Sequence, residues 1–128
     1  MNTLTTNGIT ISVESFYQHE HSNVRLHKYV YSYRITIQNK SNTTVQLLRR
    51  HWFIQDSLGP KKEVEGDGVI GKQPILHPGE SHQYTSWTIL HSDIGKMYGT
   101  YLMHTRPKGK SLYVRIPEFK LIAPFRLN

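Results

Sequence analysis

Hydrophobic and polar residues alternate with a period of two along much of this chain. The clearest run covers residues 29–37, where every second position is Tyr or Ile. Residues 9–13 repeat the pattern, with Ile, Ile and Val separated by Thr and Ser. This period is typical of strands that bury one face, and aromatic and β-branched side chains suit a pleated surface. We therefore predict a strand over each segment.

Later segments repeat the alternation and are separated by turn signals. The further predicted strands cover residues 44–55, 61–65, 81–90, 96–104 and 112–121. The hydrophobic phase slips between Leu47 and Leu48 and again at Pro117, which predicts a β-bulge at each place. No window combines a helical period with a cap and a glycine stop. We expect one all-β domain over residues 1–128, a β-sandwich of about seven to eight antiparallel strands.

Amino-acid composition limits the cellular environments and the classes of partner that fit this chain. The chain has no cysteine, which excludes disulfides and Cys-ligated zinc. No run of about 18 apolar residues exists and residues 1–6 are polar, so we expect no membrane span, no signal peptide and a cytoplasmic location. The formal net charge of +7 favours anionic partners. The basic residues are scattered, and their densest cluster, residues 106–110, is predicted to be a hairpin tip, so the charge does not favour nucleic acid.

The sequence carries no recognisable catalytic or cofactor motif. None of the eight histidines stands in H-E-x-x-H spacing, and His19 and His21 fall in a polar, loop-like stretch. Ser81 follows a turn and lacks the G-x-S-x-G elbow of a serine nucleophile. The nine carboxylates show no paired arrangement of the kind that glycosidases use. We therefore expect no catalysis, no metal site and no cofactor.

The chain contains a literal G-x-G-x-x-G made by Gly66, Gly68 and Gly71, with Lys72 directly after it. In a dinucleotide-binding fold such glycines open a helix whose N-terminus faces a pyrophosphate. Here two prolines follow within seven residues, and they forbid a helix. The motif therefore stands in a different structural context from the nucleotide-binding one.

Two interpretations of this loop remain. The glycines can let the chain cross from one sheet to the other, through positive φ angles and close backbone approach. Alternatively, successive N–H groups of the loop form an anion nest, to which Lys72 and Arg49 or Arg50 add positive charge.

The neighbouring segment Arg49-Arg50-His51-Trp52 is a second candidate. On a strand, Arg50 and Trp52 share one face, while Arg49 and His51 share the other. A core tryptophan beside a snorkelling arginine is one expectation. Alternatively, the exposed Arg49 and His51 bind an anion or an acidic partner. In a third interpretation, the aromatic residues form a stacking platform for single-stranded nucleic acid.

Several of these segments, taken in order, resemble the bacterial ApaG family. They span about residues 10–123 and comprise residues 13–17, 33–39, 45–52, 64–74, 76–81, 84–86, 95–101 and 116–121. Their combination and order, rather than any one of them, make the resemblance specific.

The resemblance implies a fibronectin type III-like, immunoglobulin-like β-sandwich and no established enzymatic activity. Members of the family are associated with cobalt and magnesium resistance or efflux. Related domains in eukaryotic F-box proteins and in a DNA-polymerase-interacting protein look like protein-interaction modules. The family's glycine motif has been discussed as a pyrophosphate site and maps here onto Gly66, Gly68 and Gly71. Trp87 stands where the family has a small residue, which predicts an exposed aromatic side chain.

Our first expectation is a non-catalytic module that binds an unidentified protein, for example by strand addition to a sheet edge. The alternative is nucleotide or polyphosphate binding through the glycine loop. The candidate residues for this alternative are Gly66, Gly68, Gly71, Lys72, Arg49, Arg50 and His51. A sandwich with free edges can also pair into a homodimer.

Overall fold

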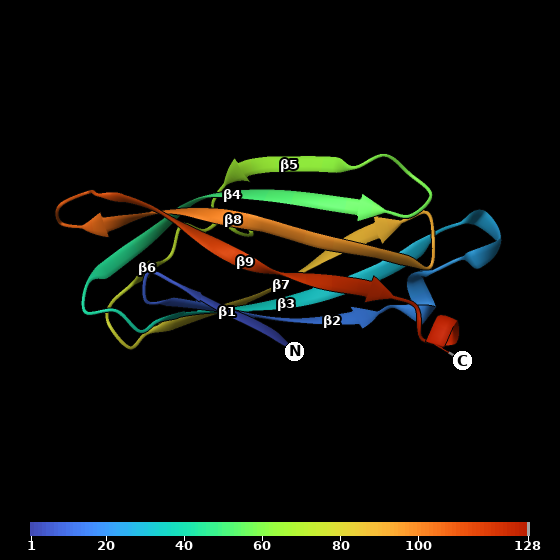
Figure 1. Cartoon of the computed structure of the whole chain (residues 1–128), viewed down its shortest axis with the longest axis horizontal. Coiled ribbons are helices and arrows are strands. Elements are labelled where there is room, and N and C mark those ends of the chain that lie inside the picture. Colours follow the sequence, from blue (N-terminus) through green and yellow to red (C-terminus); the bar gives the residue numbers. More distant parts are fainter. Residues whose placement is uncertain (128) are drawn as a thin grey trace.

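Two antiparallel β-sheets pack face to face in the computed structural model, which describes residues 1–127 (Figure 1). The strands in this range are β1 (Asn2–Thr6), β2 (Ile9–Tyr17), β3 (Tyr29–Asn39), β4 (Thr44–Asp56), β5 (Lys62–Asp67), β6 (Ile75–Leu76), β7 (Ser81–Leu90), β8 (Ile94–Arg106) and β9 (Ser111–Ile122). Three short 3-10 helices complete the secondary structure, namely η1 (His19–His21), η2 (Val24–Leu26) and η3 (Pro124–Leu127). The expected all-β sandwich is confirmed.

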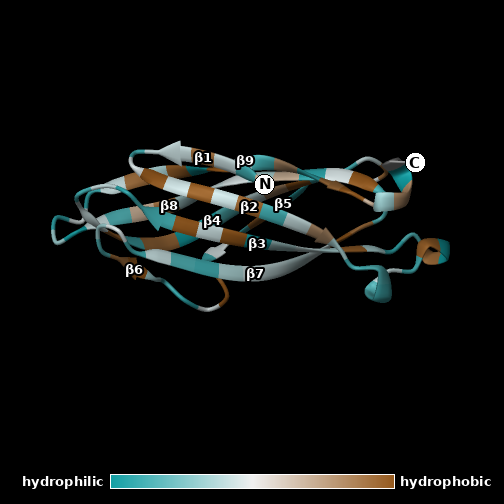
Figure 2. Ribbon diagram, turned by 90° about the horizontal axis from the view of Figure 1, so that it is seen from below, coloured by the Kyte–Doolittle hydropathy of each residue, from teal (hydrophilic) through white to brown (hydrophobic). Residues whose placement is uncertain are grey.

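The strand order determines which strands lie at the edges. One sheet has the order β1-β2-β3-β7 and the other has the order β5-β4-β8-β9, with the short β6 paired to β4. In Figure 2 the first sheet faces the reader, with β1 at its upper edge and β7 at its lower edge. The sandwich therefore has one side where β1 and β9 lie close together and another where β7 and β5 end their sheets.

The period-two pattern explains the core. Ile9, Ile11 and Val13 of β2 have almost no exposed surface, and so do Ile35 and Ile37 of β3. The same alternation appears as bands along the strands in Figure 2. Each fully buried side chain of this size contributes roughly 1.5–3 kcal/mol to folding, so this shared inner layer holds the sheets together.

Both predicted bulges are confirmed. The β4–β8 register shifts between Leu47 and Arg49, and the β8–β9 register shifts between Met97 and Gly99, opposite Pro117. Sequence analysis missed β1 and β6. The first is a largely polar segment and the second has only two residues, so neither shows a usable hydrophobic period.

Candidate binding site at the open side of the sandwich

A cleft of about 280 Å³ opens between the sheets on the side where β7 and β5 end them. Its aromatic lining comes from Tyr33, Trp52 and Tyr84. Trp87 of β7 borders the cleft, and its ring packs edge-on against His21 at 5.3 Å between centroids. Arg50 is the one charged residue among the described residues that line it. A mainly apolar concavity with a few polar groups is the usual form of a binding pocket.

Alternation along β4 divides the four residues 49–52 as predicted. Trp52 is 3% exposed and packs edge-on against Tyr33 in the core, with ring centroids 5.5 Å apart. Arg50 lies on the same inner face and lines the cleft. Arg49 and His51 lie on the outer face, where Arg49 forms an ion pair of 2.6 Å with Asp67. The expectation of a core tryptophan is confirmed.

Arg50 organises the first half of the glycine motif. Its Nη1 atom donates hydrogen bonds to the backbone carbonyls of Asp67 and Gly68, at 2.9 and 3.0 Å. The guanidinium lies against Gly66, where a Cβ atom would come within 2.8 Å of the Arg50 Nη2 atom. Hydrogen bonds from a charged donor are about twice as strong as neutral ones, so this arginine anchors the loop to β4.

The second half of the motif is a tight turn. Val69 and Lys72 exchange backbone hydrogen bonds of 2.8 and 3.0 Å, and Ile70 and Gly71 between them both have positive φ. Two consecutive positive φ angles are the mark of a type I′ turn. Gly68 also has positive φ, and a Cβ atom there would lie 2.2 Å from the Lys72 carbonyl oxygen. The expected positive φ angles at Gly68 and Gly71 and the close backbone approach are confirmed. The expected crossing between the sheets at this loop is wrong, because β5 and β6 on its two sides both pair with β4.

The seven residues predicted for an anion site do not converge. Arg50 and Gly71 line the cleft, and Gly66 lies against the Arg50 guanidinium, whereas Arg49 and His51 lie on the opposite face of β4. Arg49 is paired with Asp67, and Arg50 donates to the loop carbonyls. The His51 imidazole lies near two glutamates, and Lys72 lines a separate hollow beside the start of β7.

Three tyrosines form the buried end of the site. The hydroxyl groups of Tyr84 and Tyr101 hydrogen-bond to each other, and Tyr33 lies beside them. Burial raises the pKa of all three phenols, and in each it is the largest cause. These hydroxyls are therefore neutral at physiological pH, and the cleft offers hydrogen-bonding groups and one cation rather than anions.

β7 forms the exposed rim of the cleft. Its ten residues, Ser-His-Gln-Tyr-Thr-Ser-Trp-Thr-Ile-Leu, include no Lys, Arg, Asp, Glu, Pro or Gly. Burial, and secondarily the Lys72 charge, lower the pKa of His82, so this histidine is also neutral at pH 7. Trp87 is 51% exposed and Ile89 is 45% exposed. The predicted exposed aromatic is confirmed.

Both ends of β7 are fixed to the rest of the sandwich. Before the strand, the Asn39 N–H donates to the Glu80 carbonyl at 2.9 Å and the Gly79 N–H donates to the Asn39 carbonyl at 2.8 Å. After it, the Asp56 carboxylate accepts hydrogen bonds from the His91 N–H and the Ser92 hydroxyl. The strand is thus held in place before any ligand arrives, which lowers the entropic cost of binding.

A model described as the ApaG domain matches residues 19–105 of this chain. The chain belongs to the ApaG domain family. A Protein ApaG from Paramagnetospirillum magneticum is 44% identical over 127 residues, and the alignment covers 97% of each chain. A Protein ApaG from Vibrio vulnificus is 44% identical over 120 residues, with 94% of each chain covered.

Solved structures agree with this assignment. A crystal structure of a putative ApaA protein from Bordetella pertussis superposes with a TM-score of 0.87 at 40% identity, over 91% of this chain and 94% of that one. A second X-ray structure, from a structural genomics programme, gives a TM-score of 0.85 at 39% identity, over 92% of this chain and 89% of that one. None of these names specifies an activity, a substrate or a partner.

Sequence reasoning missed most of the cleft in this ApaG-family chain. Tyr33, Tyr84 and Trp87 were assigned to strands, but the strand order that brings them together is non-local. One usable signal was the absence of charge from residues 81–90. Among the described residues, no helix is long and apolar enough to cross a membrane.

Proposed function

We propose that this ApaG-family chain is a non-catalytic binding module that takes up an extended segment of a partner protein as an additional strand along β7. Strand addition supplies affinity through main-chain hydrogen bonds and specificity through pockets for alternate side chains. β7 provides the edge, and the cleft beside Trp87 provides the pocket.

The observation that carries this proposal is the unprotected edge. In an antiparallel sheet, every second residue of an edge strand turns its N–H and C=O groups outward. Natural proteins normally protect such a row with charges, prolines, bulges or very short strands. β7 is ten residues long, and its register with β3 runs from Leu90 to Ser81 without a bulge. Such an edge is suited to pairing with another chain.

The chemistry of the cleft defines the segment that would fit. The aromatic side chains of Tyr33, Trp52 and Tyr84 in the cleft favour one large apolar side chain, seated between β7 and the glycine loop. The net charge of +7 favours a partner whose remaining residues are acidic, because complementary charge speeds and orients the encounter. The expected ligand is an extended, mildly acidic peptide with an aromatic or large aliphatic anchor.

The alternative, nucleotide or polyphosphate binding at the glycine loop, has weaker support. The Arg50 guanidinium and the N–H groups of Gly68, Val69 and Lys72 all donate hydrogen bonds within the protein. An anion would have to compete with these backbone carbonyls. A rise in melting temperature with millimolar pyrophosphate, but not with inorganic sulfate, would favour this alternative.

A peptide selection tests the proposal directly. A display library of random linear peptides is selected on the wild-type protein, and synthetic versions of the selected peptides are titrated by fluorescence anisotropy. Trp87→Lys should lower their affinity at least tenfold, because it places a charge on the edge and removes the large exposed side chain of β7. Tyr113→Lys is the matched control, since Tyr113 is 64% exposed on β9 of the other sheet.

Three results would contradict the proposal. The library could yield no binder at a Kd below about 1 mM. Trp87→Lys and Tyr113→Lys could weaken binding equally. Finally, dimerisation of the wild type that Trp87→Lys abolishes would make a second copy of the chain the occupant of β7 instead.

A further inference from the structure

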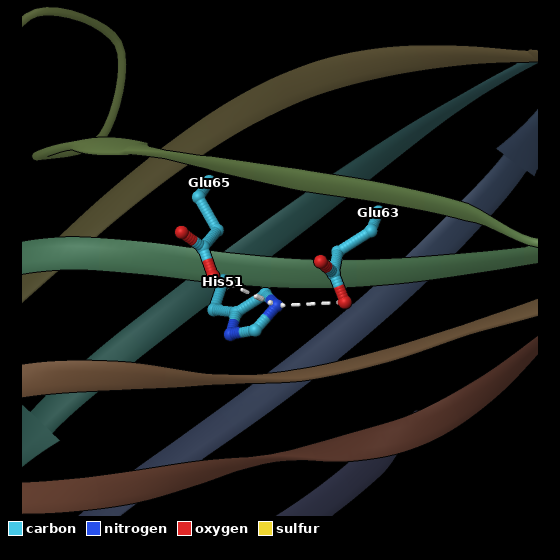
Figure 3. A group of neighbouring side chains, drawn as sticks. All are labelled: His51, Glu63 and Glu65. Carbon is cyan, nitrogen blue, oxygen red and sulfur yellow. Dashed lines mark ion pairs between the residues drawn. The ribbon is translucent and has the colours of Figure 1, made fainter.

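On the outer face of the other sheet, three side chains with metal-ligating atoms meet. The ligand atoms of His51, Glu63 and Glu65 all lie within 4.8 Å of one another (Figure 3). We propose that these three residues form a binding site for a borderline first-row divalent cation such as Zn²⁺. The site is independent of the β7 edge, because it lies on β4 and β5 and faces away from the cleft.

The sheet geometry brings the ligands together. In the β4–β5 register, His51 is directly opposite Glu65, and Phe53 is opposite Glu63. Since side chains alternate across a strand, residues two apart share a face, and all three ligands point to the same side. Figure 3 shows both carboxylates directed toward the imidazole. A paired β-ladder holds ligands with more precision than a loop does.

The distances fit a shared ion. The His51 Nε2 atom is 3.4 Å from the Glu63 Oε1 atom and 3.2 Å from the Glu65 Oε1 atom. Tetrahedral zinc with bonds of about 2.0–2.1 Å separates its ligand atoms by about 3.3–3.4 Å. The two separations from the His51 nitrogen therefore resemble edges of such a tetrahedron.

The His51 Nε2 atom also lacks a conventional partner. It has almost no exposed surface and makes no hydrogen bond among the described residues, although the two carboxylate oxygens are close. The oxygens thus do not take up the ring N–H in a directed way, and a buried polar atom without a partner is costly. A cation between the three atoms would satisfy the nitrogen through its lone pair.

The negative charge of the two carboxylates is only partly balanced by nearby basic side chains. Glu63 and Glu65 lie on one face of one strand, and His51 is the only basic side chain within ion-pair distance of either among the described residues. Arg49 is occupied by Asp67, and the Lys61 ammonium lies over the rings of Phe53 and Tyr98. A divalent cation would neutralise both carboxylates.

The donor set selects the class of ion. One imidazole and two carboxylates suit zinc and its first-row neighbours better than Mg²⁺ or Ca²⁺, which prefer oxygen ligands alone. Three protein ligands leave the fourth position to water or to a group from another molecule. Sequence analysis expected no metal site, because His51 is separated from the glutamates by more than ten residues and only the register unites them.

Calorimetric titration of the metal-free protein with Zn²⁺ tests the site. The wild type should bind one ion, and His51→Gln, Glu63→Gln and Glu65→Gln should each weaken binding at least tenfold. His21→Gln is the matched control, because His19, Glu20 and His21 form another His/Glu segment of the chain. Its affinity should equal that of the wild type.

Long-range ¹H–¹⁵N NMR of the imidazoles gives a second readout. Zn²⁺ should shift the His51 Nε2 resonance before that of any other histidine. Titration with Mg²⁺ should leave it unchanged. The assignment is overturned if His51→Gln binds Zn²⁺ as the wild type does, or if another histidine responds first.

Discussion

β7 and β9 both end a sheet, yet they are built differently. β9 carries Arg115, Glu118 and Lys120 at exposed positions, contains Pro117 and has a bulge. β7 has the same kind of exposed backbone edge and none of these features. Because charges, proline and bulges are the usual means of preventing edge-to-edge pairing, the contrast indicates that β9 is protected and β7 is left open.

The neighbourhood of each edge reinforces the contrast. β1 lies next to β9, and side chains join the two sheets there: the Asn2 amide donates to the Glu118 carbonyl at 2.6 Å, and the Arg115 N–H donates to the Thr6 hydroxyl at 3.3 Å. On the other side, β7 and β5 are separated by the cleft. One side of the sandwich is therefore closed by its own side chains, and the other leaves space for a ligand.

The largest expected effect concerns the loop that walls the open side. Gly68→Ala should lower the free energy of unfolding by about 3 kcal/mol, because the new Cβ atom meets the Lys72 carbonyl oxygen and the residue keeps a positive φ. Gly71→Ala should cost only about 1 kcal/mol, since φ is positive there but no atom lies within 4 Å of the new Cβ atom. Urea unfolding measures both. Equal losses would show that close approach at Gly68 does not matter.

A smaller effect concerns the anchored end of β7. Although burial acts to raise it, the pKa of Asp56 lies below its usual value, because hydrogen bonds from the Ser92 hydroxyl and from the N–H groups of His91 and Leu58 outweigh burial. Asp56→Asn should cost about 2 kcal/mol at pH 7, since the charged acceptor is lost.

The pH dependence of this effect has a defined sign. A carboxyl group whose pKa is lower in the folded protein contributes stability above its unfolded value of about 3.9, and this contribution disappears as the pH falls through the folded pKa. The gap in unfolding free energy between wild type and Asp56→Asn should therefore narrow below about pH 4. A gap that stays constant from pH 7 to pH 2.5 would contradict the role of the charged carboxylate.

Peptide backbones probe the edge itself. If a selected peptide pairs with β7, N-methylation of alternate residues should lower its affinity, because each methyl group removes one N–H donor to the strand. Each sensitive position should cost about 1 kcal/mol, or roughly fivefold in Kd. Positions between them should tolerate the methyl group. A loss without period two would indicate a different binding geometry.

Removing the protection of β9 should produce the smallest effect. The double variant Arg115→Thr/Lys120→Thr changes two exposed positions, so its stability should stay within about 0.5 kcal/mol of the wild type. Its tendency to self-associate should rise, measured by sedimentation velocity over a range of concentrations. Unchanged association would show that β1 and Pro117 suffice to close that edge.

Sequence patterns predicted the local structure of this chain well. The alternation located most strands, the two phase slips located the bulges, and the opposite faces of Arg50 and His51 followed from period two. These features depend on neighbours along the chain.

The candidate sites depend instead on which strands pair. Strand order makes β7 an edge and brings Trp87 close to the glycine loop. Strand register places His51 beside Glu63 and Glu65. The glycine motif shows the limit of spacing alone. In a dinucleotide-binding fold the same three glycines would contact a pyrophosphate. Here Gly66 leaves space for the Arg50 guanidinium, Gly68 leaves space for the Lys72 carbonyl, and Gly71 completes a turn with positive φ.

Hydrogen exchange at the β7 amides tests the central claim most directly. In the free protein, the N–H groups of residues 81–90 that point away from β3, toward the free edge, should exchange rapidly. The N–H groups between them, which are paired with β3, should exchange slowly. A saturating selected peptide should slow the outward set in β7 and leave β9 unchanged. Protection that appears elsewhere, with the outward β7 amides still exchanging rapidly, would contradict strand addition at this edge.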